Sequence, residues 1–359
     1  MQRWAKDIYW PLIVSMLGLA CVGILFVYSA THYQVNQYAM KQLFWVFFGF
    51  MVFFIVALMG YRFFLGTSYL FYVLSLILLV VVDVIGHTHL GAQRWLHLGP
   101  VAVQPSEFAK LATVLALANY LGSHHRWENE NRILSVALLM TFIPGMLIVK
   151  QPDLGSAMLF VPMILVLLFL WGIRYRYLIA GALLTMGGVP FLWGFLKEYQ
   201  KKRLLVFLNP GLDPLGAGYT AIQSRIAVGA GGMFGKGYLD GTQIQLDFVP
   251  EHHTDFIFCV IGEEWGYAGT IILLALYGLL FKAVFQVISS TTDVKAKLLA
   301  GGVLAVIFSQ VFINIGMTFG FMPIAGLTLP LVSYGGSSFI ATAAALGLVL
   351  SIYKGRSIF

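Results

Sequence analysis

Charged residues are scarce in this sequence of 359 residues, since Asp, Glu, Lys and Arg together make up 10% of the chain. Soluble globular domains carry about 25% charge, and hydrophobic residues reach 59% here. A water-soluble protein is therefore excluded. A chain of this length instead accommodates about ten membrane-spanning helices of roughly 20 residues each.

Cysteine is also scarce. The only two, Cys21 and Cys259, lie far apart, in or beside apolar runs. Two such residues give no support for a disulfide framework, and they leave the redox compartment open. We interpret each of them as a small side chain in the apolar core.

Ten apolar segments approach or reach the length of a transmembrane helix. They cover residues 8–30, 42–60, 68–86, 101–121, 133–149, 154–173, 177–196, 255–281, 297–320 and 324–353. The first is longer than the apolar core of a signal peptide and is predicted to remain as an uncleaved span. The last is long enough to contain a broken stretch near residues 330–336. We therefore predict an all-α integral membrane protein with about ten transmembrane helices, forming a single polytopic domain over residues 1–359.

The basic residues are divided unevenly between the two sides of this bundle. Ten spans place both termini on one side, where the connections contain twelve Lys and Arg residues. The short loops opposite contain three, namely Lys41, Arg94 and Lys150. The positive-inside rule then puts both termini in the cytoplasm. The net charge of +7 is thus a topology signal, and no nucleic-acid partner is expected.

Most acidic residues lie on the outer side, which indicates function at that face.

One extracytoplasmic loop is much longer than the other connections, about 60 residues over 197–254. Long loops in compact proteins are usually functional or disordered, and the apolar content of this one argues against disorder. We expect it to fold against the membrane surface, with residues 220–228 as a short interfacial helix. Its glycine-rich stretch, residues 229–237, lacks the spacing of a nucleotide-binding P-loop. This stretch either cradles a phosphate through backbone N–H groups or serves packing.

Acids and histidines gather at the outer start of the eighth predicted span, where residues 250–258 include His252, His253 and Asp255. An ionisable residue inside a span is costly and indicates function. Burial would raise the pKa of Asp255 toward the value that a general base needs; the alternative is a carboxylate that caps the helix. Adjacent histidines rarely chelate one ion, so we expect these two to form interfacial hydrogen bonds.

A second charged cluster lies near the outer start of the fourth predicted span. Glu107 and Lys110 are three residues apart and share a helix face, which predicts either a structural salt bridge or an ion site. Arg94, beside Trp95, offers a guanidinium fork to a phosphate at the interface. Asp153 begins the sixth span, where it is a candidate substrate contact and also a plain N-cap.

The outer loop adds three basic side chains, Arg203, Arg225 and Lys236. Cations beside carboxylates at a membrane surface suit a substrate that has a phosphate and a proton to lose. This combination favours a lipid-linked phosphate whose transferable group lies outside the membrane. Contact with anionic lipid headgroups is the alternative.

A polar turn interrupts the last apolar segment, where Ser333, Tyr334 and Ser337 follow Pro330. Non-helical backbone at membrane depth is tolerated only where it is buried in protein or lines a cavity. The turn therefore predicts a cavity near the outer face. These three polar side chains are candidate substrate contacts.

In order and spacing, these motifs resemble the SEDS family (shape, elongation, division and sporulation), and the RodA branch closely. The resemblance rests on residues 91–96, 104–110, 151–155, 203, 209–210, 213–219, 229–237, 250–258, 262–264 and 314–338; it does not include Arg225. It implies a bacterial peptidoglycan glycosyltransferase that polymerises lipid II, the undecaprenyl-pyrophosphate-linked disaccharide pentapeptide, at the outer leaflet of the cytoplasmic membrane. It also implies a class B penicillin-binding protein as the transpeptidase partner in cell elongation.

The resemblance carries the family's key aspartate to Asp255, which we interpret as the general base that deprotonates the acceptor sugar hydroxyl. Lys110, Arg203 and Lys236 are candidate pyrophosphate contacts, with Glu107 orienting Lys110. The sequence requires no cofactor and shows no metal-ligand cluster, although a divalent cation beside Asp255 is compatible with the reaction.

Two other function classes remain as alternatives. A lipid II flippase would also have many spans, intramembrane acids and a broken helix. Alternating access, however, needs a site near the midplane, whereas the charges here collect at the outer ends of the helices. A non-catalytic membrane scaffold would leave the buried Glu107, Lys110 and Asp255 unexplained.

Overall fold

The computed structural model of the chain describes residues 9–32, 38–89, 92–98, 101–124, 129–177, 179, 181, 183, 187, 194, 201, 205–214, 216 and 218–355. In this part, eight helical segments are long and apolar enough to cross a membrane. They are α2 (Trp10–Thr31), α3 (Tyr38–Met59), α5 (Ser68–Ile85), α7 (Glu130–Lys150), α8 with α9 (Leu154–Met158 and Phe160–Trp171), α15 (Gly266–Ser290), α16 (Val294–Phe319) and α17 (Gly336–Gly355). The predicted multi-pass helical membrane protein is confirmed.

Shorter elements complete the described part of the chain. They are α4 (Tyr61–Gly66), β1 (His87–His89), β2 (Ala92–Leu98), β3 (Val101–Val103), α6 (Pro105–Ser123), the 3-10 turn η2 (Pro210–Leu212), α12 (Tyr219–Ala230), α13 (Thr242–Gln245) and α14 (Ile257–Glu264). Helix α6 is the fourth predicted span; it is less apolar than the other spans because its buried face carries charged side chains. The predicted span 177–196 lies outside the described residues except at single positions.

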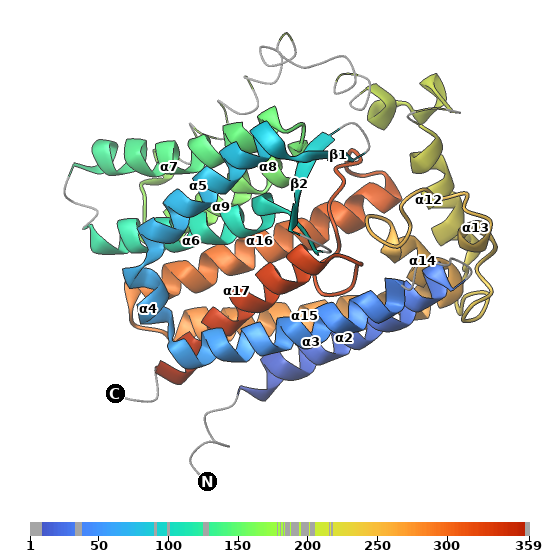
Figure 1. Cartoon of the computed structure of the whole chain (residues 1–359), viewed down its shortest axis with the longest axis horizontal. Helices are drawn as coiled ribbons and strands as arrows, with labels where there is room; N and C mark the ends of the chain where they lie inside the picture. Colours follow the sequence, from blue (N-terminus) through green and yellow to red (C-terminus); the bar gives the residue numbers. More distant parts are fainter. Residues whose placement is uncertain are drawn as a thin grey trace.

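Helix α16 lies at the centre of the bundle (Figure 1). It contacts α6 and α9 on one side and α15 and α17 on the other. Helix α17 packs chiefly against α3, and α15 against α2. Because α16 touches both halves of the bundle, a polar side chain on it reaches elements that are far apart in sequence.

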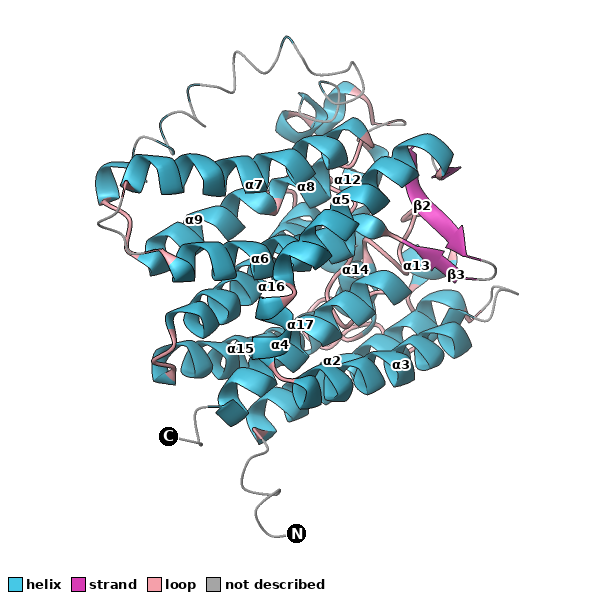
Figure 2. Ribbon diagram, turned by 60° about the vertical axis from the view of Figure 1, so that its left-hand side comes forward, coloured by secondary structure: helices cyan, strands magenta, loops and turns pink. Residues whose placement is uncertain are grey.

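The two ends of the described chain meet at the same end of the bundle. The rings of Tyr9, before α2, and Tyr353, in α17, stack with their centroids 4.3 Å apart. Helices α12, α13 and α14 lie at the opposite end (Figure 1), and Figure 2 shows β2 and β3 there as well. The prediction that the termini share one side is therefore confirmed, and the polar elements gather on the other.

A small antiparallel sheet departs from the all-helical prediction. Strand β2 lies between β1 and β3, so the predicted span that begins at residue 101 starts as a strand and becomes helical at Pro105. A proline at the first helical position explains this boundary, since it lacks an N–H that the first turn leaves unpaired anyway. The sheet carries Arg94 and Trp95 toward the polar end of the bundle.

The glycine-rich stretch of the outer loop packs against a break between α14 and α15. A Cβ added at Gly235 would lie 2.0 Å from the carbonyl oxygen of Glu264, and Gly266, at the break, has φ +61. The backbone N–H groups of Lys236 and Gly237 donate to the carbonyls of Glu263 and Glu264 at 3.0 and 3.1 Å. Carbonyls of the chain itself occupy these two N–H groups, which favours the packing alternative. The predicted short helix over residues 220–228 is confirmed as α12; its place at the membrane interface stays a prediction.

The last apolar segment is broken over a longer stretch than predicted. Residues 321–335 are non-helical throughout, with Gly326 at φ +67 and Leu331 at φ +66. Pro323 and Pro330 lie in the same stretch and cannot donate to a helical hydrogen-bond ladder. The segment therefore folds back at the polar end, between α16 and α17.

Candidate active site

A tight turn places Asp255 at the entrance of α14. The carbonyl of Glu251 accepts hydrogen bonds from the backbone N–H groups of residues 254–256 at 3.2, 3.1 and 3.3 Å. The buried side-chain amide of Asn314, in α16, donates to the carbonyls of Asp255 and Leu327 at 2.8 and 2.5 Å. The central helix thus holds the turn and the broken segment together.

The carboxyl group of Asp255 has a pKa close to neutral pH. Burial, reinforced by the charge of Glu251, raises its pKa to about 6, while a hydrogen bond from Thr254 and the charge of Arg94 act in the opposite direction. Asp255 forms no ion pair with any residue that the structure describes. The N-cap of α14 is Phe256, so the helix-cap alternative is wrong. An unpaired carboxylate of this pKa is suited to accept a proton.

Arg94 faces the same small space as Asp255. A Cβ added at Gly326 would lie 3.5 Å from Asp255 Oδ2 and 3.9 Å from Arg94 Nη1. The guanidinium donates to the carbonyl of Pro152 and lies 3.7 Å from Asp153 Oδ1. Its Nε is buried and has no hydrogen-bond partner in the described part of the chain. A guanidinium with spare donors beside a carboxylate is placed to receive an anionic group.

Asp153 caps a helix, as predicted, and also contacts Arg94. Its Oδ1 accepts from the backbone N–H of Ser156 at 3.2 Å and so caps α8. Its Oδ2 accepts from the side-chain amide of Gln104 at 3.3 Å, and Arg94 approaches from β2. Trp95 is half-buried and, as the next residue of the strand, points to the opposite face. Asp153 therefore orients Arg94, whereas Trp95 lies apart from this contact.

The polar turn of the broken segment is tied to the site through its backbone. The Ser333 hydroxyl accepts from a backbone N–H within its own turn at 2.8 Å, and Ser337 Oγ accepts from the N–H of Gln104 at 3.0 Å. The N–H of Tyr334 donates to the carbonyl of His253 at 3.0 Å. The two serine side chains thus fix the turn in place, beside Asp255.

Aromatic rings gather two residues before Asp255. The ring of Tyr38 lies 4.8 Å from that of His253 and 5.0 Å from that of Tyr334, centroid to centroid. Burial lowers the pKa of His253, and its Nδ1 is buried without a hydrogen-bond partner among the described residues. His253 is therefore a neutral ring with a free polar atom, at the edge of the site.

His252 plays the hydrogen-bonding role expected of it. Its two ring nitrogens lie 2.9 and 2.8 Å from the carbonyl oxygens of Val249 and Ala30. It thereby ties the loop before Asp255 to the C-terminal end of α2. The described residues contain no group of three or more His, Cys, Asp or Glu side chains placed to hold a metal ion.

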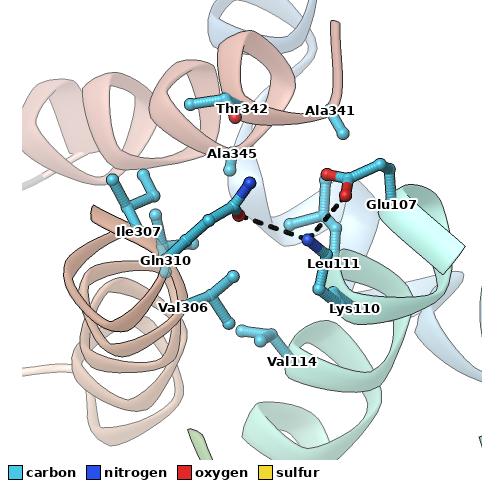
Figure 3. A pocket seen from close by; sticks show the side chains of 11 residues that line it. Glu107, Lys110, Leu111, Val114, Val306, Ile307, Gln310, Ala341, Thr342 and Ala345 are labelled. Carbon is cyan, nitrogen blue, oxygen red and sulfur yellow. Dashed lines mark hydrogen bonds and ion pairs between the residues drawn. The ribbon is translucent and has the colours of Figure 1, made fainter. Parts of the chain in front are cut away.

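Glu107 and Lys110 form the predicted salt bridge inside the bundle. Lys110 Nζ lies 2.8 Å from Glu107 Oε1 and donates to Gln310 Oε1 at 3.2 Å, as Figure 3 shows. Gln310 in turn donates to the carbonyl of Thr328 at 3.0 Å. The adjoining cavity, of about 30 Å³, has room for about two water molecules. The pair is linked to the broken segment but is not in contact with Asp255.

Lys236 is engaged in a different ion pair. Its Nζ lies 2.7 Å from Glu263 Oε1 and 2.7 Å from Thr242 Oγ1. Glu263 is fully buried and also accepts the backbone N–H groups of Gln243 and Ile244 at 2.9 and 3.2 Å. Lys236 therefore fastens the outer loop to α14. Arg203, the other loop cation expected to contact pyrophosphate, lies outside the described residues.

Two buried polar residues of α16 were not predicted as site residues, although Asn314 begins one of the stretches that carry the family resemblance. Gln310 and Asn314 are four residues apart and so share a helix face. One holds Lys110 and the other holds the backbone of Asp255. Their signal was a pair of amides at helical spacing within an apolar helix. An amide carries no charge, so its presence in an apolar helix is a weaker signal than a buried Glu or Lys.

The chain as a whole is similar to a known protein family. Residues 9–358 match the FtsW, RodA and SpoVE family model, described as cell cycle protein. The chain belongs to this family. The FtsW/RodA/SpoVE match covers every residue of the site described above, from Arg94 to Ser337, and it confirms the resemblance to the SEDS proteins.

Curated relatives within the FtsW/RodA/SpoVE family are similar over nearly their full length. The peptidoglycan glycosyltransferase MrdB of Escherichia coli (strain K12) is 40% identical over 346 residues, covering 96% of this chain and 93% of the relative. The peptidoglycan glycosyltransferase RodA of Treponema pallidum (strain Nichols) is 33% identical over 426 residues, covering 98% of each.

Solved structures of the family share the fold. A chain from a peptidoglycan synthase complex, solved in a study of how polymerization and crosslinking are coordinated, aligns with a TM-score of 0.84 and 34% identity, covering 97% of this chain and 98% of that chain. The rod shape determining protein RodA of Thermus thermophilus aligns with a TM-score of 0.72 and 31% identity, covering 97% of both chains.

Proposed function

We propose that this chain is a peptidoglycan glycosyltransferase that polymerises lipid II at the outer face of the bacterial cytoplasmic membrane, with Asp255 as the general base. The observation that carries the proposal is the unpaired carboxyl group of Asp255, with a pKa of about 6, beside the guanidinium of Arg94. A base and an anion-binding cation in one space are what transfer of a glycosyl group from pyrophosphate requires. The activity named for MrdB and RodA supports the same assignment.

The reaction needs one proton acceptor and one stabilised leaving group. Asp255 takes the proton from the acceptor sugar hydroxyl, whose oxygen then bonds to the anomeric carbon of the donor. The bond from that carbon to the pyrophosphate oxygen breaks, and the electron pair leaves with the pyrophosphate. Attack opposite the leaving group inverts the α-linked donor to a β-linked product. Pyrophosphate needs no proton to leave if cations neutralise the charge that develops.

Arg94 is the cation best placed to receive the pyrophosphate, because Asp153 and Pro152 fix its orientation and its Nε remains free among the described residues. Glu107 and Lys110 do not contact Asp255 and act through other residues. Through Gln310 they set the position of Thr328 in the broken segment. Lys110 is therefore assigned an indirect role.

The location and partners follow from the same proposal. The positive-inside rule puts the end that carries Asp255 outside the cytoplasm. The synthase complex that matches this fold unites polymerization with crosslinking, which supports a class B penicillin-binding protein as partner. No resident cofactor is required, and a divalent cation beside Asp255 would act by neutralising the pyrophosphate.

One experiment tests the function. The purified full chain, alone and with the transpeptidase partner, is given labelled lipid II in detergent, where there is no bilayer to cross. We expect glycan strands from the wild type and a loss of about 10²–10⁴-fold in Asp255→Asn, the usual contribution of a general base. Asp293→Asn is the matched control, since that carboxylate caps α16 at the opposite end.

The control should polymerise as the wild type does. If no variant forms polymer under any condition while liposomes that contain the protein scramble lipid II, the flippase replaces the glycosyltransferase. If Asp255→Asn polymerises at the wild-type rate, Asp255 is not the base.

A further inference from the structure

One amide nitrogen of the central helix joins the backbone of the base to the broken segment. Asn314 Nδ2 donates to the carbonyl of Asp255 at 2.8 Å and to that of Leu327 at 2.5 Å. No backbone N–H of the described residues donates to either carbonyl, since Asp255 precedes α14 and Leu327 lies in non-helical chain. Backbone carbonyls inside a protein are nearly always paired. Among the described residues, Asn314 alone supplies that partner to both segments.

The other atom of the same amide is left without a partner. Asn314 is 0% exposed, and its Oδ1 is buried with no hydrogen bond to the described residues. A buried acceptor in this state costs about 1–3 kcal/mol. Such a group in a native fold calls for an explanation other than stability, and the two carbonyls that Nδ2 holds supply one.

Those two carbonyls lie on either side of the space between the base and the cation. Leu327 follows Gly326, where an added Cβ would lie 3.5 Å from Asp255 Oδ2 and 3.9 Å from Arg94 Nη1. Gly326 has φ +67, so glycine is favoured there by the backbone, and the missing side chain keeps the space open. Asn314 thus holds Asp255 on one side of the space and the Gly326 segment on the other.

The carboxylate of Asp255 depends on its backbone for its position, because it forms no ion pair with any described residue. Two sets of hydrogen bonds hold that backbone. The turn that ends on the carbonyl of Glu251 is local. The bond from Asn314 is the one that ties Asp255 to α16, the helix that contacts both halves of the bundle.

We propose that Asn314 is a positioning residue for glycosyl transfer, whose amide sets the distance between the Asp255 carboxylate and the segment that contains Gly326. The inference rests on the proposed glycosyltransferase function. A general base must lie about 2.6–3.2 Å from the atom that gives up the proton, and a misplacement of about 1 Å costs about 10²-fold in rate. Asn314 touches no substrate in this proposal; it acts through Asp255.

Gln310 provides a comparison inside the same helix. It lies one helical turn before Asn314, and its amide donates to the next carbonyl of the broken segment, that of Thr328, at 3.0 Å. Its other partner is Lys110, so it holds the broken segment but not the base. Gln310→Met should therefore lower the rate less than a substitution of Asn314 does.

The competing explanation is that Asn314 only stabilises the fold. Loss of buried hydrogen bonds would then lower the melting temperature, while the folded protein would keep its kcat. Positioning makes a different prediction, because a displaced base slows the chemical step and leaves substrate binding as it was. Rates must therefore be measured below the melting temperature of every variant.

The test compares initial rates of the purified full chain, with its transpeptidase partner, on labelled lipid II in detergent. Asn314→Leu keeps a similar volume without donors, and we expect its kcat to fall about 10²-fold with KM unchanged. Asn314→Gln keeps the amide on a longer arm and should recover part of the rate. Thr318→Val is the matched control: this buried hydroxyl, one turn farther along α16, donates to the carbonyl of Ile315 at 2.7 Å, and its loss should leave kcat unchanged.

Hydrogen exchange gives a readout that does not depend on activity. The N–H groups of residues 254–256 donate to Glu251, and that of Leu329 donates to Ser333 Oγ. Exchange at these positions should be faster in Asn314→Leu and unchanged in Thr318→Val. The residual activity of Asn314→Leu should keep the wild-type pH profile, because Asp255 is still the base.

Three results would overturn the inference. They are a wild-type kcat in folded Asn314→Leu, a rise in its KM with kcat preserved, and an equal loss of kcat in Thr318→Val. The second would place Asn314 in substrate binding, and the third would make the effect a general one of buried hydrogen bonds in α16. A wild type that polymerises as fast as Asn314→Leu contradicts this inference alone. A wild type that never polymerises, although exchange responds to Asn314→Leu as expected, contradicts the proposed function alone.

Discussion

Asp255 and Glu263 are two acids eight residues apart on one continuous segment, yet their surroundings differ in kind. Glu263 accepts hydrogen bonds from Lys236, Thr242 and two backbone N–H groups at the start of α13. Asp255 has no ion pair among the described residues, and its main anchor to the bundle passes through its own carbonyl, held by Asn314. We call the carboxylate of Glu263 saturated, because several donors bind it, and that of Asp255 open, because it has no ion-pair partner among the described residues.

This difference separates structural acids from reactive ones better than burial does. A carboxylate whose oxygens accept several hydrogen bonds is fixed in position and has few acceptor sites left for a substrate. A carboxylate with few donors in an enclosed place keeps its proton to a higher pH and is free to exchange it with a substrate. Glu107, paired with Lys110, belongs with Glu263, and Asp255 stands apart from both.

The largest expected effect comes from removing one partner of the most buried pair. Lys110→Met leaves Glu107 charged, enclosed and without its cation, which costs about 3–5 kcal/mol of stability. The double variant Lys110→Met/Glu107→Gln removes both charges and should recover most of this loss. Thermal unfolding in detergent measures the difference. Equal destabilisation of the single and double variants would mean that the pair is not the source of the cost.

The open carboxylate should behave in the opposite way. The folded pKa of Asp255 is about 6 against a usual value of 3.8, so ionisation of Asp255 destabilises the fold by about 3 kcal/mol at pH values above both. Asp255→Asn should therefore raise the unfolding midpoint at pH 7.5. The gain should shrink as the pH falls from 6 and should vanish below 3.8, where the carboxyl is protonated in both states. A gain that is independent of pH would contradict the raised pKa.

Glu263→Gln should produce a smaller loss. The amide keeps one acceptor oxygen but loses the charge that Lys236 and the α13 N–H groups neutralise, and Lys236 is 29% exposed, so it can turn to water. We expect a loss of about 2 kcal/mol, within the range for hydrogen bonds to charged groups. Hydrogen exchange at residues 242–245 gives a local readout. Unchanged protection there would show that Glu263 does not anchor the loop.

The separation of open from saturated acids was only partly visible in the sequence. Asp255 and the Glu107–Lys110 pair could be predicted because a charged residue inside an apolar run is costly and therefore indicates a function or a partner. For Glu107 and Lys110 the partner is only three residues away in the sequence. Lys236 was assigned to pyrophosphate because its partner, Glu263, lies 27 residues away. A single sequence does not reveal which distant charges meet in space.

The glycine-rich stretch and the sheet show the same limit. Gly231 and Gly235 are required by contacts with the carbonyls of Gly262 and Glu264, which only the folded chain brings together. Strand β2 contains polar residues and lies between two predicted spans, so the sequence predicts a loop in its place. Long apolar runs, by contrast, predict spans directly, because their length alone matches the membrane.

The smallest effect, and the most direct view of the open carboxylate, is the pH dependence of polymerisation. Because Asp255 acts in its ionised form and has a pKa of about 6, kcat/KM should fall about tenfold for each pH unit below that value. Glu251 raises this pKa by its charge. Glu251→Gln should therefore move the acidic limb to lower pH, while Glu263→Gln should leave the limb in place, because the Glu263 carboxylate is not among the groups that shift Asp255. Initial rates on lipid II between about pH 4.5 and 8 decide the matter: a flat profile removes Asp255 as the base, and a shift in Glu263→Gln alone would show that the two acids are coupled.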